Sequence, residues 1–147
     1  MKIVPLFAAF LLSLGACTPD APAGPSLTDA WVRAAPSERA MTAAYLAVNN
    51  PTDKPLTITG VRAPGSADAM LHTTIESDGV SRMRPLPALV VPAGETTRFE
   101  PGGIHIMLVR ATVEFEEGAA IQIEIDTDAH GTLQVLAPVR VQAPAVE

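Results

Sequence analysis

Strict alternation of apolar and polar residues is the feature that most limits how this 147-residue chain can fold. Residues 121–125 read IQIEI and residues 56–59 read LTIT, so both runs alternate at every position. Successive side chains of a β-strand point to opposite faces of the sheet, so this pattern predicts strands with one buried and one exposed face. Residues 42–48 and 132–139 are further strand candidates.

Turn signals rich in Gly, Pro, Asn and Asp separate stretches of about 6 to 12 residues. They are Asn49–Pro51, Ala63–Gly65, Asp78–Gly79, Pro92–Gly94 and Pro101–Gly103. No window keeps the 3.6-residue apolar period that an amphipathic helix requires. Short strands with regular turns predict an all-β domain, either an antiparallel sandwich or a barrel.

The N-terminal residues have the composition of a secretory signal. Lys2 supplies a cationic start, and Ile3–Leu14 is an apolar run much shorter than the roughly 20 residues of a membrane-spanning helix. Leu14–Cys17, read as LGAC, resembles the lipobox of bacterial lipoproteins, in which the cysteine carries the lipid. The alternative is an ordinary signal peptide that leaves Cys17 as a free thiol. We expect residues 1–16 to be cleaved and Cys17 to anchor the protein to a bacterial membrane in the periplasm.

The remaining chain divides into a tether, one domain and a short tail. Residues 17–28 contain the lipidated Cys17 and a Pro- and Gly-containing stretch, which is typical of a flexible tether. Residues 29–141 form one domain of a size that can bury a core without cross-links, and residues 142–147 are a C-terminal tail. Cys17 is the only cysteine, which excludes a disulfide within the chain.

Charge and motif content exclude several classes of function. Removing Lys2 with the signal leaves nine basic against 16 acidic residues, a formal charge of −7, and no basic patch that would favour nucleic acid. The chain contains no HExxH motif, nucleophile elbow or P-loop, so we do not expect an enzyme.

One predicted strand carries two residues that could bind a soft metal ion. Ile104, Ile106 and Leu108 alternate and would face the core, so His105 and Met107 would project together from the opposite face. The alternative is that Met107 packs and His105 is a solvated surface residue.

A second His and Met pair flanks a predicted hairpin. His72 precedes the turn signal and Met83 follows it. A two-residue turn at positions 77 and 78 would place His72 directly opposite Met83, whereas a turn at positions 78 and 79 would place Met83 opposite Thr74 and diagonal to His72. Both registers keep His72 and Met83 on the same face of the sheet.

Other candidates have simpler interpretations. Met70 lies on the face of His72 and is a possible auxiliary metal ligand, although packing at the rim of the site is the favoured interpretation. Met41 is expected to pack at the start of a strand, Trp31 to lie in the core, and His130 to be solvated at a hairpin tip.

The spacing of these residues matches a known family. His72, Met83, His105 and Met107 stand in the order H-x10-M-x21-H-x-M, which resembles the signature of the periplasmic copper chaperones of the PCu(A)C type. Similar strings surround them at Asp29–Arg33, Ala43–Leu46, Asp78–Val80, Met83–Pro85, Val91–Gly94 and Pro101–Leu108. The resemblance extends over residues 29–139, and its mild departure is Ile104 where an aromatic residue is common.

The resemblance implies a cupredoxin-like Greek-key β-sandwich that binds one Cu(I) through those four side chains, and Cu(II) is kept as an alternative cofactor. It also implies delivery of copper to an acceptor protein, namely cytochrome c oxidase copper centres or another copper chaperone. The donor chemistry agrees, because thioethers suit Cu(I) whereas protein zinc sites use Cys, His and carboxylate. A blue-copper centre is disfavoured because it needs a thiolate, and Cys17 precedes the tether.

Two alternatives to delivery remain open at this point. One is copper buffering or tolerance by a lipoprotein with the same ligands. The other is a metal-free β-sandwich that acts as an interaction module of the cell envelope.

Overall fold

The computed structural model describes residues 24–35, 41–111, 113 and 115–141. These residues form ten strands and no helix, so the predicted all-β fold is confirmed. No helix among them is long and apolar enough to cross a membrane. The predicted signal segment, Cys17 and the C-terminal tail lie outside the described residues.

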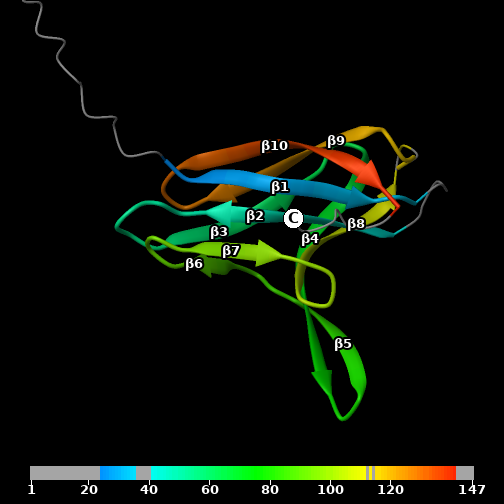
Figure 1. Ribbon diagram of the computed structural model, residues 1–147, viewed down its shortest axis with the longest axis horizontal. Helices are drawn as coiled ribbons and strands as arrows, with labels where there is room; N and C mark the ends of the chain where they lie inside the picture. The colour runs from blue at the N-terminus through cyan, green and yellow to red at the C-terminus, as the bar shows by residue number, and fades with distance from the viewer. Residues whose placement is uncertain (1–23, 36–40, 112, 114, 142–147) are drawn as a thin grey trace, which may run out of the picture.

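The strands form two layers, which Figure 1 shows packed one over the other. One layer contains β1 (Ser26–Arg33), β2 (Thr42–Asn49), β4 (Ser66–Ser77), β5 (Val80–Pro85), β7 (Thr96–Phe99) and β8 (Ile104–Ala111). The other contains β3 (Leu56–Arg62), β6 (Leu89–Val91), β9 (Ala120–Thr127) and β10 (Gly131–Arg140). The order of the main path is β5-β4-β8-β2-β1-β10-β9-β3-β6, and β7 pairs with β2 beside β8.

One strand pair departs from the antiparallel pattern expected from the sequence. β1 runs parallel to β10, with Val32 opposite Val139, and this pair joins the two layers. The other strand pairs of the described residues are antiparallel. The sandwich is therefore a mixed sheet that is folded over on itself.

The core lies between the layers and follows the alternation of the sequence. Ile123 and Ile125 of β9 are fully buried, as are Ile106 and Leu108 of β8. Burying each such side chain away from water contributes about 1.5–3 kcal/mol to the stability of the fold. Because these residues point inward, their neighbours in β8, including His105, point to the outer face of the sheet.

β1 begins three residues earlier than the expected start of the domain. Ser26, Leu27 and Thr28 pair with residues 49, 48 and 47 of β2, and Leu27 packs against the core. The physical reason is the alternation of polar, apolar and polar residues, which lets Leu27 face the core while Ser26 and Thr28 remain exposed. Residues 26–28, assigned to the tether from their composition, thus belong to the sheet.

The β4–β5 hairpin extends away from the sandwich, as Figure 1 shows. Ser77 pairs with Val80, so the turn consists of Asp78 and Gly79, which have φ of 54° and 72°. A two-residue turn with positive φ at both positions matches the right-handed twist of the strands, and Asp-Gly favours it. All six residues of β5 are exposed.

Candidate metal centre

Two histidines lie opposite each other on neighbouring strands. His72 of β4 pairs with His105 of β8 in the antiparallel register. Their ring centroids are 5.9 Å apart and their ring planes meet at 78°. Both side chains lie on the outer face of the sheet, because Leu71 and Ile106 beside them are buried in the core. The structure therefore brings together two imidazoles that are distant in the sequence.

A hydrogen bond to the backbone orients His105. Its Nδ1 lies 3.1 Å from the carbonyl oxygen of Gly103, which also accepts a hydrogen bond from the Thr74 amide. A carbonyl oxygen can only accept, so this contact requires the proton on Nδ1 and leaves the lone pair of Nε2 free. His105 is 4% exposed, which differs from the solvated surface residue considered as an alternative.

The Nδ1 atom of His72, unlike that of His105, has no hydrogen-bond partner in the described part of the chain. This nitrogen is also buried. Burial lowers the pKa of His72 below its ordinary value of 6.5, and the neighbouring His105 lowers it further. A neutral imidazole with an unpartnered nitrogen is the form that binds metal ions, and coordination would satisfy this otherwise unfavourable buried atom.

An aromatic pair forms the wall beside His105. The ring centroid of Tyr45 lies 6.5 Å from that of His105, and Trp31 stacks on Tyr45 at 4.6 Å. Burial raises the pKa of Tyr45, while the guanidinium of Arg33, 5.7 Å from the ring centroid, opposes this shift. Trp31 is buried as expected, but it packs on the outer face with Tyr45 rather than within the main core cluster. Stacked rings exclude water from one side of His105.

Two methionines lie on the same outer face as the histidines. Met107 follows His105 by two residues in β8 and is partly buried. Met83 of β5 pairs with Thr74, which places it diagonal to His72, so the second of the two predicted registers is confirmed. Met83 is 63% exposed on the hairpin.

The remaining candidates are distributed as follows. Met70 of β4 pairs directly with Met107 of β8 and is 36% exposed. Met41 is 66% exposed just before β2, so the packing expected for it is not observed. His130 is exposed in the turn between β9 and β10, as predicted.

Sequence reasoning assigned no role to Gly103 or Tyr45. The carbonyl of Gly103 orients His105, and the ring of Tyr45 covers it. Both residues lie in the strings that carry the family resemblance, which was the available signal. Their roles depend on contacts between strands that the linear pattern does not contain.

Hard metal ligands are not gathered in the described part of the chain. Within it, no group of three or more His, Cys, Asp and Glu side chains is placed to hold a metal ion. Calcium and magnesium sites are built from several oxygen ligands, and structural zinc sites from four Cys or His ligands. The cluster at His72 and His105 can reach four donors only by including thioethers, which favours copper.

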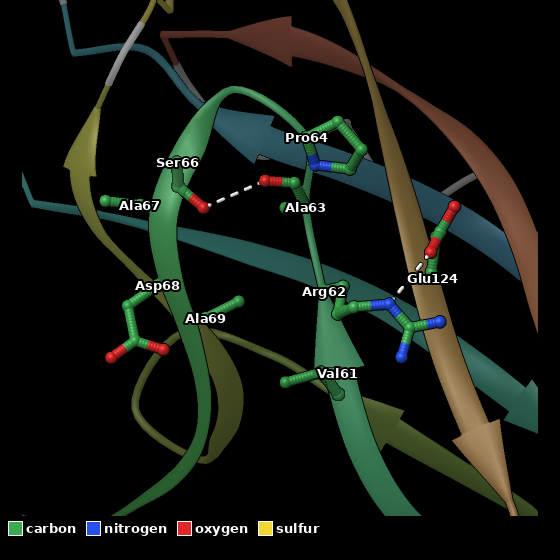
Figure 2. Close-up of a pocket in the computed structure, with 9 residues that line it drawn as sticks. All are labelled: Val61, Arg62, Ala63, Pro64, Ser66, Ala67, Asp68, Ala69 and Glu124. Atoms are coloured by element: carbon green, nitrogen blue, oxygen red, sulfur yellow. Dashed lines mark hydrogen bonds and ion pairs between the residues drawn. The ribbon is translucent and has the colours of Figure 1, made fainter.

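A pocket of about 440 Å³ lies elsewhere, between β3, β4 and β9 (Figure 2). Arg62 crosses it to form ion pairs with Glu124 and Asp126, and Ser66 donates a hydrogen bond to the Ala63 carbonyl. Arg62, Glu124 and Ser66 thus already have polar partners. The lining residues are Val61, Arg62, Ala63, Pro64, Ser66, Ala67, Asp68, Ala69 and Glu124, which include no soft donor.

The fold matches solved copper domains. The copper-bound PCuAC domain from PmoF2 aligns with a TM-score of 0.68 at 20% identity, covering 83% of this chain and 97% of that domain. The solution structure of CuI-DR1885 from Deinococcus radiodurans aligns with a TM-score of 0.62 at 30% identity, covering 80% of this chain and 77% of that one.

Sequence comparison adds two further matches. The "Putative lipoprotein Lxx21020" of Leifsonia xyli subsp. xyli is 31% identical over 144 residues, which is 90% of this chain and 86% of that protein. The model of the LpqE-like lipoprotein family matches residues 26–139.

The two-layer fold and the matched solved structures define the class of this protein. It has the cupredoxin-like fold of the PCuAC domains, so the fold implied by the resemblance is confirmed. The chain belongs to the LpqE-like lipoprotein family.

Proposed function

We propose that this protein is a copper chaperone of the bacterial periplasm, anchored to a membrane through Cys17. It binds one Cu(I) through His72, Met83, His105 and Met107 and delivers it to a copper-accepting protein. The copper centres of cytochrome c oxidase are the acceptor implied by the family resemblance. The observation that carries the proposal is the direct pairing of His72 with His105 on a face that also presents Met83 and Met107.

The donor set suits monovalent copper. Thioether sulfur is soft and matches Cu(I), and imidazole nitrogen is a borderline donor that binds the same ion. All four donors are neutral when they bind, so the ion keeps its charge in the complex. A thiolate on an acceptor attracts that charge more strongly, and copper can therefore pass from this set to a thiolate site.

The relatives support copper as the cargo. The PCuAC domain from PmoF2 is described as copper-bound, and the Deinococcus radiodurans protein as CuI-DR1885. The lipoprotein description of the family and of the Leifsonia relative supports a lipid anchor. A carrier function also explains why two donors differ in exposure, with His105 enclosed and Met83 open to solvent.

A competition titration of the full-length chain against a colorimetric Cu(I) chelator tests the proposal. We expect one tightly bound Cu(I), with sulfur and nitrogen in the first shell by X-ray absorption. His105→Ala should weaken binding by at least about tenfold, as expected for the loss of one ligand. His130→Ala removes an exposed imidazole from the turn between β9 and β10 and serves as the matched control, with unchanged affinity. A shell of oxygen or nitrogen alone would refute the ligand assignment.

Delivery is tested separately from binding. Copper-loaded protein is mixed with a dithiol peptide that mimics a cysteine-containing copper acceptor, and the metal content of both is measured after separation. Transfer to the dithiol supports a chaperone. Retention of copper under these conditions supports a buffering role and contradicts delivery.

A further inference from the structure

Met70 precedes His72 by two residues in β4 and lies on the same face of the sheet. It pairs directly with Met107 across the β4–β8 boundary, in the same register in which His72 pairs with His105. Side chains two residues apart in a strand lie on the same face. The four residues therefore form a compact square of two imidazoles and two thioethers on two adjacent strands.

Met83 is more distant from this square. It lies on β5, beyond β4, and pairs with Thr74. Directly opposed residues have Cβ atoms about 4.5–5.5 Å apart, whereas diagonal neighbours are about 7–8 Å apart. Met70 and Met107 are opposed, while Met83 is diagonal to His72 and separated from Met107 by a whole strand. By register alone, Met70 is closer to Met107 than Met83 is.

The strand that carries Met83 has little packing to hold it. All six residues of β5 are exposed, and the hairpin extends from the sandwich in Figure 1. Segments with few buried contacts open at low free energy. Met70, in contrast, lies in the part of β4 that is paired with β8 and flanked by the buried Leu71. The two thioethers thus sit on elements of different local stability.

We propose that Met70 is an alternative copper ligand, which takes the place of Met83 and holds the ion together with His72, His105 and Met107 when Met83 withdraws. This inference rests on the proposed copper-binding function and deepens it. The exchange replaces one neutral thioether by another, so no proton or electron moves and the charge of the centre is unchanged. Withdrawal of Met83 with its hairpin opens one side of the copper to an acceptor, while Met70 prevents premature loss.

The test compares Met-to-Leu variants of the full-length chain, because leucine has a similar volume and no sulfur donor. The variants are Met70→Leu, Met83→Leu, the double variant and Met41→Leu, the last being an exposed methionine outside the square. Cu(I) affinity is measured by chelator competition. The number of sulfur ligands is measured by X-ray absorption, and thermal unfolding of the metal-free proteins verifies that each variant folds.

We expect Met83→Leu to keep two sulfur ligands, because Met70 takes the vacant position beside Met107. Its affinity should fall by about tenfold or less, and the double variant should fall by more than the product of the two single effects. The double variant should retain one sulfur ligand. Met41→Leu should match the wild type.

Two outcomes would overturn the proposal. They are a single sulfur ligand in Met83→Leu and an affinity of the double variant equal to that of Met83→Leu. Failure of the underlying function is distinguishable, because the wild type would then bind no Cu(I) at all.

Discussion

His72 and His105 face each other across the β4–β8 boundary, with ring centroids 5.9 Å apart and ring planes at 78°. The backbone carbonyl of Gly103 holds one ring, while the other has a buried nitrogen without a hydrogen-bond partner in the described part of the chain. This asymmetry means that His105 is oriented before metal binds, whereas His72 gains a partner only on binding. The proposed copper centre is thus half preorganised.

Protons should compete with Cu(I) only in mildly acidic solution. Burial and the neighbouring His105 lower the pKa of His72 below 6.5, so its ring stays neutral to a lower pH than a free histidine. We expect Cu(I) affinity to be constant above about pH 6.5 and to weaken gradually below it, because the thioethers do not protonate. His72→Met should flatten this dependence. Chelator competition at several pH values measures it, and a flat wild-type profile would contradict the imidazole ligands.

The same pKa shift affects the stability of the metal-free protein. The unfolded chain takes up a proton at His72 more readily than the folded chain does, so stability should fall as pH decreases below about 6.5. The contribution is fully present above that pH and is lost as pH falls through the lower folded pKa. Urea unfolding of the wild type and of His72→Asn measures it. An equal pH dependence in both proteins would show that His72 is not the group involved.

The core side of β8 should control stability more than the exposed hairpin does. Ile106 is fully buried between the positions of His105 and Met107, so Ile106→Ala should lower the free energy of unfolding by about 2–5 kcal/mol. Ile75 on the hairpin is 46% exposed and provides the matched control. The free energy of unfolding of Ile75→Ala should lie within about 0.5 kcal/mol of that of the wild type. Denaturant unfolding of both variants gives the comparison. Equal losses would mean that the hairpin packs more firmly than its exposure indicates.

Metal binding should protect one exposed methionine from oxidation and not another. Met41 and Met83 are 66% and 63% exposed, so peroxide should oxidise both readily in the metal-free protein. Silver(I), a soft monovalent ion without accessible redox chemistry here, replaces Cu(I) in the experiment. We expect it to protect Met83 but not Met41, as read by mass spectrometry of peptides. Equal protection would argue against Met83 as a specific ligand.

Membrane attachment should depend on one residue outside the described part of the chain. Cys17→Ala should release the protein from the membrane fraction, because no lipid could then be attached at the LGAC motif. Copper affinity should not change, since the proposed ligands are far from Cys17 in the sequence. Fractionation and chelator competition test both parts. Retention of the variant in membranes would argue against lipidation at this cysteine.

Much of the fold could be predicted from alternation alone. The runs at residues 56–59 and 121–125 became β3 and β9 because each buries one face, which is the physical origin of the pattern. The sequence left two hairpin registers open, since both keep His72 and Met83 on one face. Positive φ at Asp78 and Gly79 in the turn decides between them, and it excludes direct opposition of the two ligands.

Contacts between distant strands could not be predicted in this way. The pairing of Met70 with Met107 depends on how β4 aligns with β8, and a shift of register would change it without altering either strand pattern. The parallel β1–β10 pair could not be predicted either, because the alternation of apolar and polar residues does not depend on the direction in which neighbouring strands run. The early start of β1 at Ser26 was missed because Pro and Gly upstream dominated the composition of that segment.

The separation of the paired histidines along the chain has a consequence for when copper can be acquired. His72 and His105 meet only after β4 and β8 have aligned, and an extended polypeptide holds them too far apart to share an ion. A chain exported in an extended state would therefore cross the membrane without cargo. For the proposed copper carrier, the first ion would then come from the compartment in which the sandwich forms, so metal supply in that compartment would limit how much of the protein is ever loaded.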